Sequence, residues 1–303
     1  MSTAVKVPPP AVIASPCTGV CRLDGASGYC LGCGRSREEI AGWRTGTVEW
    51  RTTVWERLLA RLDRLKVTAR RLPWLADDIA AFVEKSLRGR AGTWVFGVHG
   101  AVAEFSSDLG ETLAVSNSDG RIEAVTGRGA VRFHIHDGVR ALTLQRGPAT
   151  VVIALAVPKE RLSLPVHEGL AALGPDQEAI RPADRGAHRF DLGLGRASAR
   201  FTVRLASTAL HASLEAAEGA PLTALLVSHG AALLAESPNR VVESAVGRVE
   251  VMVPIPFPGS RSPSGPHTHL LPGQLATKRE TAPGLDLPDA YALGAIFHPL
   301  EAE

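Results

Sequence analysis

All four cysteines of this 303-residue chain lie within 17 consecutive positions, with the spacing C-x3-C-x8-C-x2-C. They are Cys17, Cys21, Cys30 and Cys33. Two residues between thiolates allow both sulfurs to reach one ion, and four thiolates can hold either one zinc ion or the cysteine positions of an iron–sulfur cluster. Because this stretch has too little apolar material to build a core, the spacing predicts a small module that folds around a metal.

The residues around the second cysteine pair suit a negatively charged centre. Gly32 and Gly34 let the backbone turn and point N–H groups at sulfur. Ser36 and Glu39 have the spacing of a capping box, which predicts a short helix over 37–43 directly after the last cysteine. Three arginines nearby favour thiolates electrostatically: Arg22, Arg35 and Arg37. The alternatives are four unmetallated thiols or a redox pair.

Three stretches in this region resemble a small bacterial family of unknown function that is described as predicted iron–sulfur proteins. The stretches are 15–24 (SPCTGVCRLD), 28–36 (GYCLGCGRS) and 39–43 (EIAGW). The family pattern is S-P-C-x-x-V-C, then C-x-G-C-x-R, then E-I-x-x-W, and the resemblance extends to residue 62. It implies the same four cysteine ligands and no catalytic residue. The cofactor remains open between an iron–sulfur cluster and zinc.

A basic amphipathic helix is predicted after the cysteines, over 48–70. Its apolar residues recur at helical spacing: Trp50, Val54, Leu58, Leu62 and Leu65. Residues 44–71 contain eight basic and three acidic residues, whereas the whole chain carries a formal charge of only +2. Arg57, Arg61 and Arg64 share one helix face, which is compatible with nucleic-acid phosphates, although a solvated helix face is the favoured interpretation.

From residue 93 onward the spacing of apolar residues changes from that of helices to that of short strands. We therefore expect an α+β chain: a small helical four-cysteine metal module, then a mixed, largely antiparallel α+β domain. Strands are predicted at 94–105, 112–115, 121–125, 130–136, 139–145, 150–157, 189–192, 200–205, 240–244 and 249–254. Helices are predicted at 75–87, 166–173, 209–217 and 222–235. Residues 260–266 are expected to form a loop.

These patterns divide the chain into three parts. Residues 1–14 form a disordered leader, 15–72 form the metal module with its basic helix, and 75–303 form the larger domain. Four segments of that domain resemble an uncharacterised bacterial domain family: 100–105, 174–176, 190–195 and 265–272. This resemblance implies a domain boundary and no mechanism.

Common enzyme motifs are missing from the larger domain. The glycines at 193 and 195 lack the third glycine of a dinucleotide fingerprint, and neither a phosphate loop nor a G-x-S-x-G motif occurs. Whether the chain is an enzyme is therefore left open.

Two H-x-H pairs remain, and histidines two apart on an extended strand share one face. His267 and His269, flanked by prolines in a loop expected to be rigid, are the second candidate ligand site, with Glu104 or His99 as a third ligand. His134 and His136 are expected on a solvated face. His298 is expected to be a packing or surface residue.

The favoured function is a non-enzymatic metal-binding protein with a tethered ligand- or partner-binding domain. The alternatives are a metal-dependent enzyme using His267 and His269, and a nucleic-acid-associated protein using 44–71.

No segment has the roughly 20 apolar residues of a membrane helix or the core of an export signal, so we expect a cytoplasmic protein without a membrane partner. In that compartment thiols stay reduced, which favours metal over disulfides.

Overall fold

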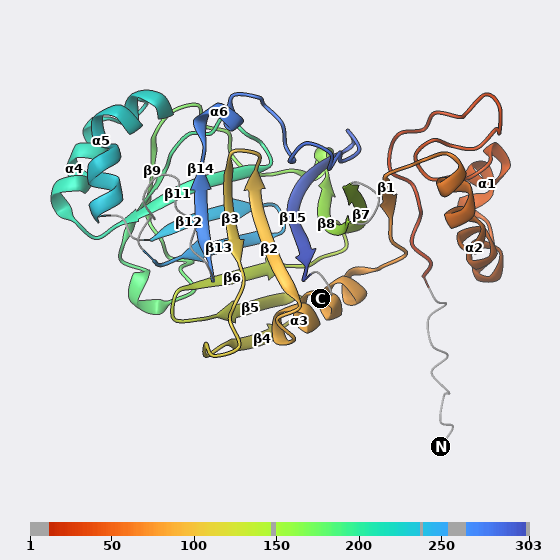
Figure 1. Cartoon of the computed structure of the whole chain (residues 1–303), viewed down its shortest axis with the longest axis horizontal. Coiled ribbons are helices and arrows are strands. Elements are labelled where there is room, and N and C mark those ends of the chain that lie inside the picture. The colour runs from red at the N-terminus through yellow and green to blue at the C-terminus, as the bar shows by residue number, and fades with distance from the viewer. Residues whose placement is uncertain (1–11, 147–149, 237–238, 254–264, 301–303) are drawn as a thin grey trace, which may run out of the picture.

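The computed structural model describes residues 12–146, 150–236, 239–253 and 265–300. Two antiparallel sheets lie against each other, and a small helical module sits at one end of them (Figure 1). The predicted α+β class, a small helical module followed by a largely antiparallel domain, is confirmed. Most of the predicted leader, residues 1–11, lies outside the described residues. In the part of the chain that the structure covers, we find no helix with the length and apolar character needed to span a bilayer.

The first sheet has seven strands, with β1 and β14 at its edges. Across the sheet they are β1 (Ala69–Arg71), β7 (Arg140–Arg146), β8 (Thr150–Pro158), β15 (Tyr291–Pro299), β2 (Gly92–Val98), β3 (Ala101–Phe105) and β14 (His267–Leu270). The central strand β15 comes from the C-terminal end of the chain. It pairs with β8 on one side and β2 on the other.

The second sheet has eight strands, all paired antiparallel. They are β4 (Ala114–Ser118), β5 (Arg121–Val125), β6 (Gly129–His134), β13 (Gly247–Val251), β12 (Arg240–Ser244), β11 (Ala199–Leu205), β10 (His188–Asp191) and β9 (Ala171–Pro175). The predicted run of strands from 94 to 157 is therefore divided between two sheets. It does not form one meander.

The main core lies between the two sheets. Along β2, Trp94 and Phe96 are buried in this core, while the alternate residues face the other side, as the two-residue period of a strand requires. Phe133 of the second sheet lies 4.8 Å from Trp94 and 5.2 Å from Phe96, ring centre to ring centre. Edge-to-face aromatic contacts of this kind contribute about 0.5–1.5 kcal/mol each beyond area burial. They hold the sheets together.

Helices pack at both ends of the sheets. α3 (Ala76–Arg88) buries Ile79, Val83 and Leu87 against the main core, and Trp94 donates from Nε1 to Ser86 Oγ at 3.0 Å. At the far end lie α4 (Thr208–Ala216) and α5 (Leu222–Glu236), while α6 (Pro272–Leu275) follows β14 (Figure 1). Short 3-10 turns occupy Gly42–Arg44, Lys159–Arg161 and Pro182–Asp184.

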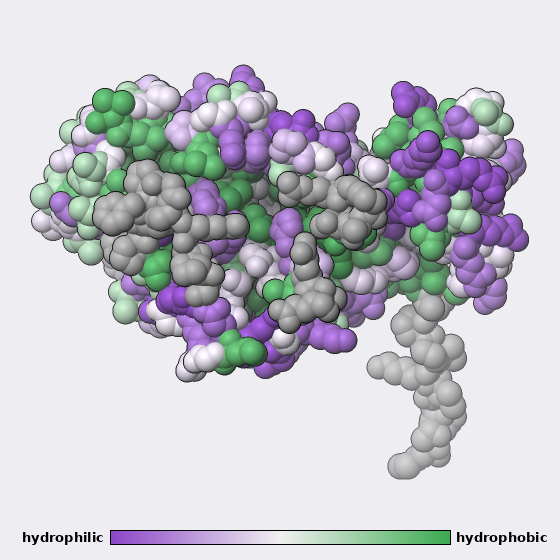
Figure 2. Space-filling model, in the orientation of Figure 1, coloured by the Kyte–Doolittle hydropathy of each residue, from purple (hydrophilic) through white to green (hydrophobic). Residues whose placement is uncertain are grey.

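The N-terminal module consists of the cysteine loops, α1 (Arg37–Ala41) and α2 (Val48–Arg64). Val54, Leu58 and Leu62 form its own small core, against which Trp50 and Trp55 also pack. Hydrophilic side chains cover much of the module's visible face (Figure 2).

The second helix ends earlier than predicted, at Arg64 instead of residue 70. Lys66 takes a left-handed conformation with φ +54°, its N–H bonds to the Asp63 carbonyl, and the Val67 N–H bonds to the Leu62 carbonyl. This is a Schellman ending, which satisfies the last carbonyls of the helix. It frees Ala69–Arg71 to extend as β1 and pair with β7.

Other predicted elements need correction in the larger domain. The predicted strand over 94–105 is a hairpin, β2 and β3, broken at Gly100, whose φ is +95°. The predicted helix over 166–173 is wrong, because Ala171–Pro175 is strand β9, paired with β10. The apolar strand β15 was not predicted at all.

The expected loop around the H-x-H pair also needs correction. Most of the predicted 260–266 loop lies outside the described residues, but His267–Leu270 form strand β14. β14 pairs with β3, so the pair is held by a backbone ladder and not by the flanking prolines.

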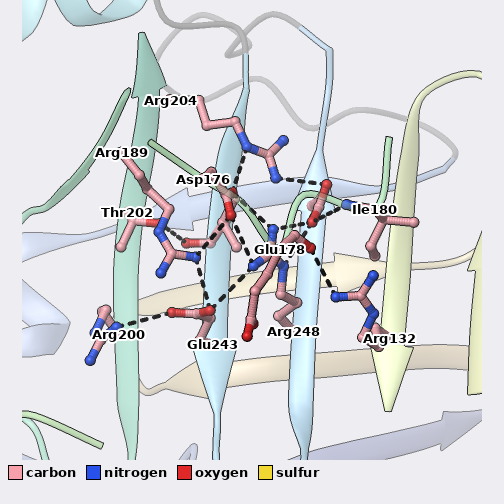
Figure 3. A network of polar contacts seen from close by, with 12 residues as sticks. Arg132, Asp176, Glu178, Ile180, Arg189, Arg200, Thr202, Arg204, Glu243 and Arg248 are labelled. Atoms are coloured by element: carbon pink, nitrogen blue, oxygen red, sulfur yellow. Dashed lines mark hydrogen bonds and ion pairs between the residues drawn. The ribbon is translucent and has the colours of Figure 1, made fainter. Parts of the chain in front are cut away.

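A buried network of arginines and carboxylates covers the outer face of the second sheet (Figure 3). Opposite charges face each other across three strand pairs: Arg132 and Glu123, Arg200 and Glu243, and Arg248 and Glu243. Carboxylates thus separate most of the guanidinium groups. This alternation lets a sheet face bury charge that would otherwise be expensive.

Asp176 lies in the segment that crosses this face, and its carboxylate is the most buried one in that segment. Its carboxylate lies 2.9 Å from Arg204 Nε, 2.9 Å from Arg248 Nη2 and 3.8 Å from Arg189 Nη1. Burial alone would raise the pKa of Asp176, but the charges of Arg248 and Arg189 outweigh it and hold that pKa below its usual value.

Replacing Asp176 by Asn should destabilise the fold. Three guanidinium groups would lose a buried counter-charge, so we expect a loss of about 3–5 kcal/mol in the free energy of unfolding, measured by denaturant titration. Asp286→Asn is the matched control, since Asp286 pairs with Arg279 at the surface and should contribute less than about 1 kcal/mol.

The same variant has a pH signature. A carboxyl whose folded-state pKa is depressed stabilises the fold above its unfolded-state pKa, and this contribution is lost as the pH falls through the folded-state pKa. The unmodified protein should therefore lose more stability on acidification than Asp176→Asn. Equal losses in the two proteins would contradict this role of Asp176.

Candidate metal centres

The cysteine loops bring the four thiols together as two pairs. The thiols of Cys17 and Cys21 are close neighbours that affect each other's ionisation, as are those of Cys30 and Cys33. Gly32 permits this approach, because a Cβ there would lie 2.4 Å from Thr18 Oγ1. The lack of a side chain at residue 32 therefore lets the first cysteine loop pack against the second.

Three donors point at sulfur. The N–H groups of Gly19 and Gly32 lie 3.4 Å from Cys17 Sγ and Cys30 Sγ, and Arg35 Nε lies 3.3 Å from Cys33 Sγ. Such bonds stabilise negative sulfur, as predicted for Gly32 and Arg35. The prediction for Gly34 is wrong, because its N–H bonds to the Cys30 carbonyl at 2.8 Å and not to a sulfur. Arg35 is buried, whereas Arg22 and Arg37 are exposed.

The thiols differ in how readily they ionise. Burial opposes ionisation of Cys30, but hydrogen bonds from the Gly32 and Cys33 backbones outweigh it and lower the pKa of Cys30. Burial raises the pKa of Cys33 despite the contact with Arg35, and the neighbouring Cys17 raises the pKa of Cys21. A metal ion would reverse both increases, since it binds thiolates.

Part of the positive charge of the basic helix α2 is engaged in contacts within the module itself. Arg61 pairs with Glu39 at 2.6 Å, donates to the Gly34 carbonyl at 3.2 Å and stacks 4.3 Å from the centre of the Tyr29 ring. Glu39 in turn completes the predicted capping box with Ser36, which begins α1. Arg61 thus joins the helix to the cysteine loops and does not offer a free guanidinium to phosphate.

The module also contacts the larger domain directly. The Cys17 carbonyl accepts hydrogen bonds from Tyr291 Oη at 3.1 Å and Arg71 Nη1 at 3.3 Å. Tyr291 begins the central strand β15 and Arg71 ends the edge strand β1, so the first cysteine loop contacts two strands of the seven-stranded sheet. The Tyr291 contact joins positions 274 residues apart and the Arg71 contact joins positions 54 apart, and neither had a signal in the sequence.

The second candidate site lies on the outer face of that same sheet. β14 and β3 pair so that His267 is directly opposite Glu104, and His269 is two residues further along the same face. His267 Nε2 lies 3.1 Å from Glu104 Oε2, and His269 Nε2 lies 3.7 Å from Glu104 Oε1. The imidazole rings are 4.6 Å apart, centre to centre.

Glu104, His267 and His269 form a compact group of metal-ligating atoms. Each offers a ligand atom that lies within 4.8 Å of those of the other two, and within the described ranges this is the one group of three or more His, Cys, Asp or Glu side chains that meets that limit. Of the two third ligands suggested by the sequence, the fold brings Glu104 to the pair. His99 instead lies at the end of β2, on the wall of the adjoining cavity.

A cavity of about 640 Å³ adjoins the group. Its floor is the outer face of β14, β3, β2 and β15, and its cover is the connection between β14 and β15, including Gln274 and Glu280. Glu104 and His269 both line it, together with His298 of β15. Arg196 anchors the cover by donating to the Leu275 and Lys278 carbonyls.

The other H-x-H pair does not form such a group. His136 is exposed and its Nδ1 accepts the Gly138 N–H at 2.9 Å, while burial lowers the pKa of His134. His298 lines the cavity, whereas packing or plain surface exposure was expected for it. Glu280 is a further cavity residue that sequence analysis missed, since it lies in an irregular connection without periodicity.

Fold and sites together describe a two-sheet antiparallel α+β protein with a cysteine-rich N-terminal module. Residues 78–302 match the model of a family of unknown function (DUF6925), and the chain belongs to this family. Residues 15–62, which hold all four cysteines, match the model of a second family, protein of unknown function (DUF1289). Both resemblances inferred from the sequence are thereby confirmed. No curated protein and no solved structure matches the chain.

The pairing of β1 with β7 leads to a prediction of how truncation affects the stability of the larger domain. A chain that begins at residue 75 lacks β1 and leaves β7 as an open edge. A chain that begins at residue 68 retains the Ala69 to Leu144 pairing and the contact of Ala69 with a second buried apolar cluster, which includes Leu142 and Leu285. We expect the shorter chain to be less stable by roughly 1–3 kcal/mol, at about 1 kcal/mol for each lost backbone hydrogen bond.

Thermal and denaturant unfolding of the two shortened chains measure this difference. Neither chain contains a cysteine, so a chelator should affect neither through the cysteine module. Equal stability of the two chains would show that β1 does not support the sheet.

Proposed function

We propose that this protein is a metal-binding protein in which Cys17, Cys21, Cys30 and Cys33 hold a metal centre, and whose two-sheet domain binds a ligand. The observation that carries the proposal is the set of donors directed at sulfur: two backbone N–H groups and the buried Arg35. Buried arginine rarely lacks an anionic partner, and thiolates on a metal supply one.

The pairing of the thiols supports an iron–sulfur cluster over a single zinc ion. At a Zn–S distance of about 2.3 Å, four tetrahedral sulfurs would lie about 3.8 Å apart, so the two pairs would have to draw together. Among the described residues, no three of these sulfurs are grouped within 4.8 Å. A cluster with two irons takes two cysteines on each iron, which suits the present pairs. Such a cluster would supply one-electron chemistry, and zinc would supply structure alone.

Contacts with the larger domain support a role for the centre beyond folding of its own loops. The Cys17 carbonyl is held by Tyr291, whose strand also forms the floor of the 640 Å³ cavity. The cysteine loop and the cavity floor are therefore connected by one strand. We infer that the module and the ligand-binding domain act together.

Cys30→Ser or Cys33→Ser should remove the metal bound at the cysteines and unfold the module around residues 15–43, because the segment has little core without it. Metal, acid-labile sulfide and visible absorbance are measured on anaerobically purified full-length protein. The double variant His134→Ala/His136→Ala is the control and should keep the metal, since those histidines are far along the chain and share no contact with the cysteine loops that the structure shows.

The readouts separate the outcomes. Iron, sulfide and visible absorbance lost together in the cysteine variants support a cluster. One equivalent of zinc that the cysteine variants lose, with no visible absorbance in the unmodified protein, would indicate a structural zinc site in place of the cluster. Full metal content in either cysteine variant would refute the ligand assignment.

A further inference from the structure

A hydrogen bond to the backbone fixes the His267 ring. Its Nδ1 lies 3.2 Å from the carbonyl oxygen of Gly265, which can only accept, so Nδ1 carries the proton. In a neutral ring, Nε2 then presents a lone pair towards Glu104 Oε2, 3.1 Å away. Two lone pairs do not attract each other, so either a proton or a metal ion must lie between these atoms.

The second histidine favours the metal over the proton. His269 Nε2 lies 3.7 Å from the other oxygen of the same carboxylate, and its ring is 4.6 Å from that of His267. A single proton between His267 and Glu104 leaves His269 outside the pair, and protonation of both rings would place two positive charges close together where the His267 side chain is only 7% exposed. One divalent ion binds both neutral rings and the carboxylate at once.

The distances between donors agree with coordination to one ion. Metal bonds of about 2.0–2.2 Å place neighbouring ligand atoms about 3.0 Å apart at right angles and about 3.4 Å apart at tetrahedral angles. The nitrogen–oxygen distances of 3.1 Å and 3.7 Å each lie within a few tenths of an ångström of these values, so small rotations of the side chains suffice. Two imidazoles select a transition ion such as zinc or iron(II) over magnesium or calcium.

We propose that Glu104, His267 and His269 bind a divalent transition metal at the floor of the 640 Å³ cavity, and that its open positions receive a small, neutral or singly negative ligand. Three protein ligands with an open position are typical of catalytic metal sites, whereas structural sites are closed. The site is separate from the cysteine centre and does not depend on it.

The cavity lining determines the class of ligand. A divalent ion with two neutral imidazoles and one carboxylate has a net charge of +1, which one monoanion or one polarised carbonyl oxygen satisfies. Glu280 adds a negative charge, and none of the described lining residues is Lys or Arg, which disfavours a phosphate dianion. Val102, Leu285, Leu293 and Ile296 supply an apolar wall for the body of the ligand. The size is that of a site for a small organic molecule.

Cobalt(II) titration of full-length protein whose cysteine centre is already filled tests the metal site. We expect one further equivalent, with the weak visible bands of nitrogen and oxygen ligands and without intense sulfur-to-metal charge transfer. His269→Ala and Glu104→Gln should each weaken this binding more than about tenfold, since loss of even an outer hydrogen-bond partner costs about 10–100-fold. His269 and Glu104 are used because the buried His267 is the ligand whose replacement most endangers folding.

The control is His134→Ala/His136→Ala, which alters the other H-x-H pair and should bind cobalt like the unmodified protein. Cys30→Ser should retain the second equivalent, which separates this site from the cysteine centre. The proposal is overturned if no further equivalent binds, or if His269→Ala and Glu104→Gln bind it as tightly as the control while their thermal unfolding stays cooperative.

Azide and inorganic phosphate test the open position on the cobalt-loaded protein. Azide, a monoanion, should change the visible spectrum, and phosphate at the same concentration should leave it unchanged. A spectrum that neither anion alters would show a closed site, and tighter binding of phosphate than of azide would overturn the ligand class.

Discussion

The register between β14 and β3 is the constraint on which the larger domain's site depends. Because side chains alternate between the two faces of a strand, this pairing buries Ala103 against the second sheet and sends Glu104, His267 and His269 to the outer face. A slip of one residue would turn the histidines inward and Thr268 outward. Thr268 Oγ1 accepts a 2.7 Å hydrogen bond from the buried Arg240, which helps to fix the register from the other side. The core and the site are thus two consequences of one alignment.

The outer faces of the two sheets differ, and this difference determines where the proposed ligand site lies. The eight-stranded sheet covers its outer face with a network in which Asp176 and Glu250 neutralise Arg204 and Arg248, an arrangement that supports the fold (Figure 3). The seven-stranded sheet leaves a cavity under the connection between β14 and β15. That connection ends at Tyr291, which also holds the cysteine loop. The cysteine module and the cavity therefore meet on one strand.

Short-range patterns in the sequence predicted the features that depend on residues close together in the chain. The capping box of Ser36 and Glu39, the amphipathic helices and most strands of the second sheet follow from short-range signals, and the cysteine spacing marked its own module. The early end of α2 depends on a left-handed Lys66, an unusual residue for that conformation. Strand β15 is apolar along its length because both its faces are buried, so it shows no alternation. The alignment of Glu104 with His267 joins positions 163 residues apart, so short-range patterns suggest Glu104 as a candidate ligand but cannot specify the pairing.

Anomalous diffraction from crystals of the full-length protein, grown with cobalt(II) after the cysteine centre is filled, tests the central claim most directly. The account predicts two separate anomalous sites, one among Cys17, Cys21, Cys30 and Cys33 and one within bonding distance of Glu104 and His269 on the cavity floor. Metal at the cysteines alone, with His267 and Glu104 in direct contact and no peak beside them, would contradict it.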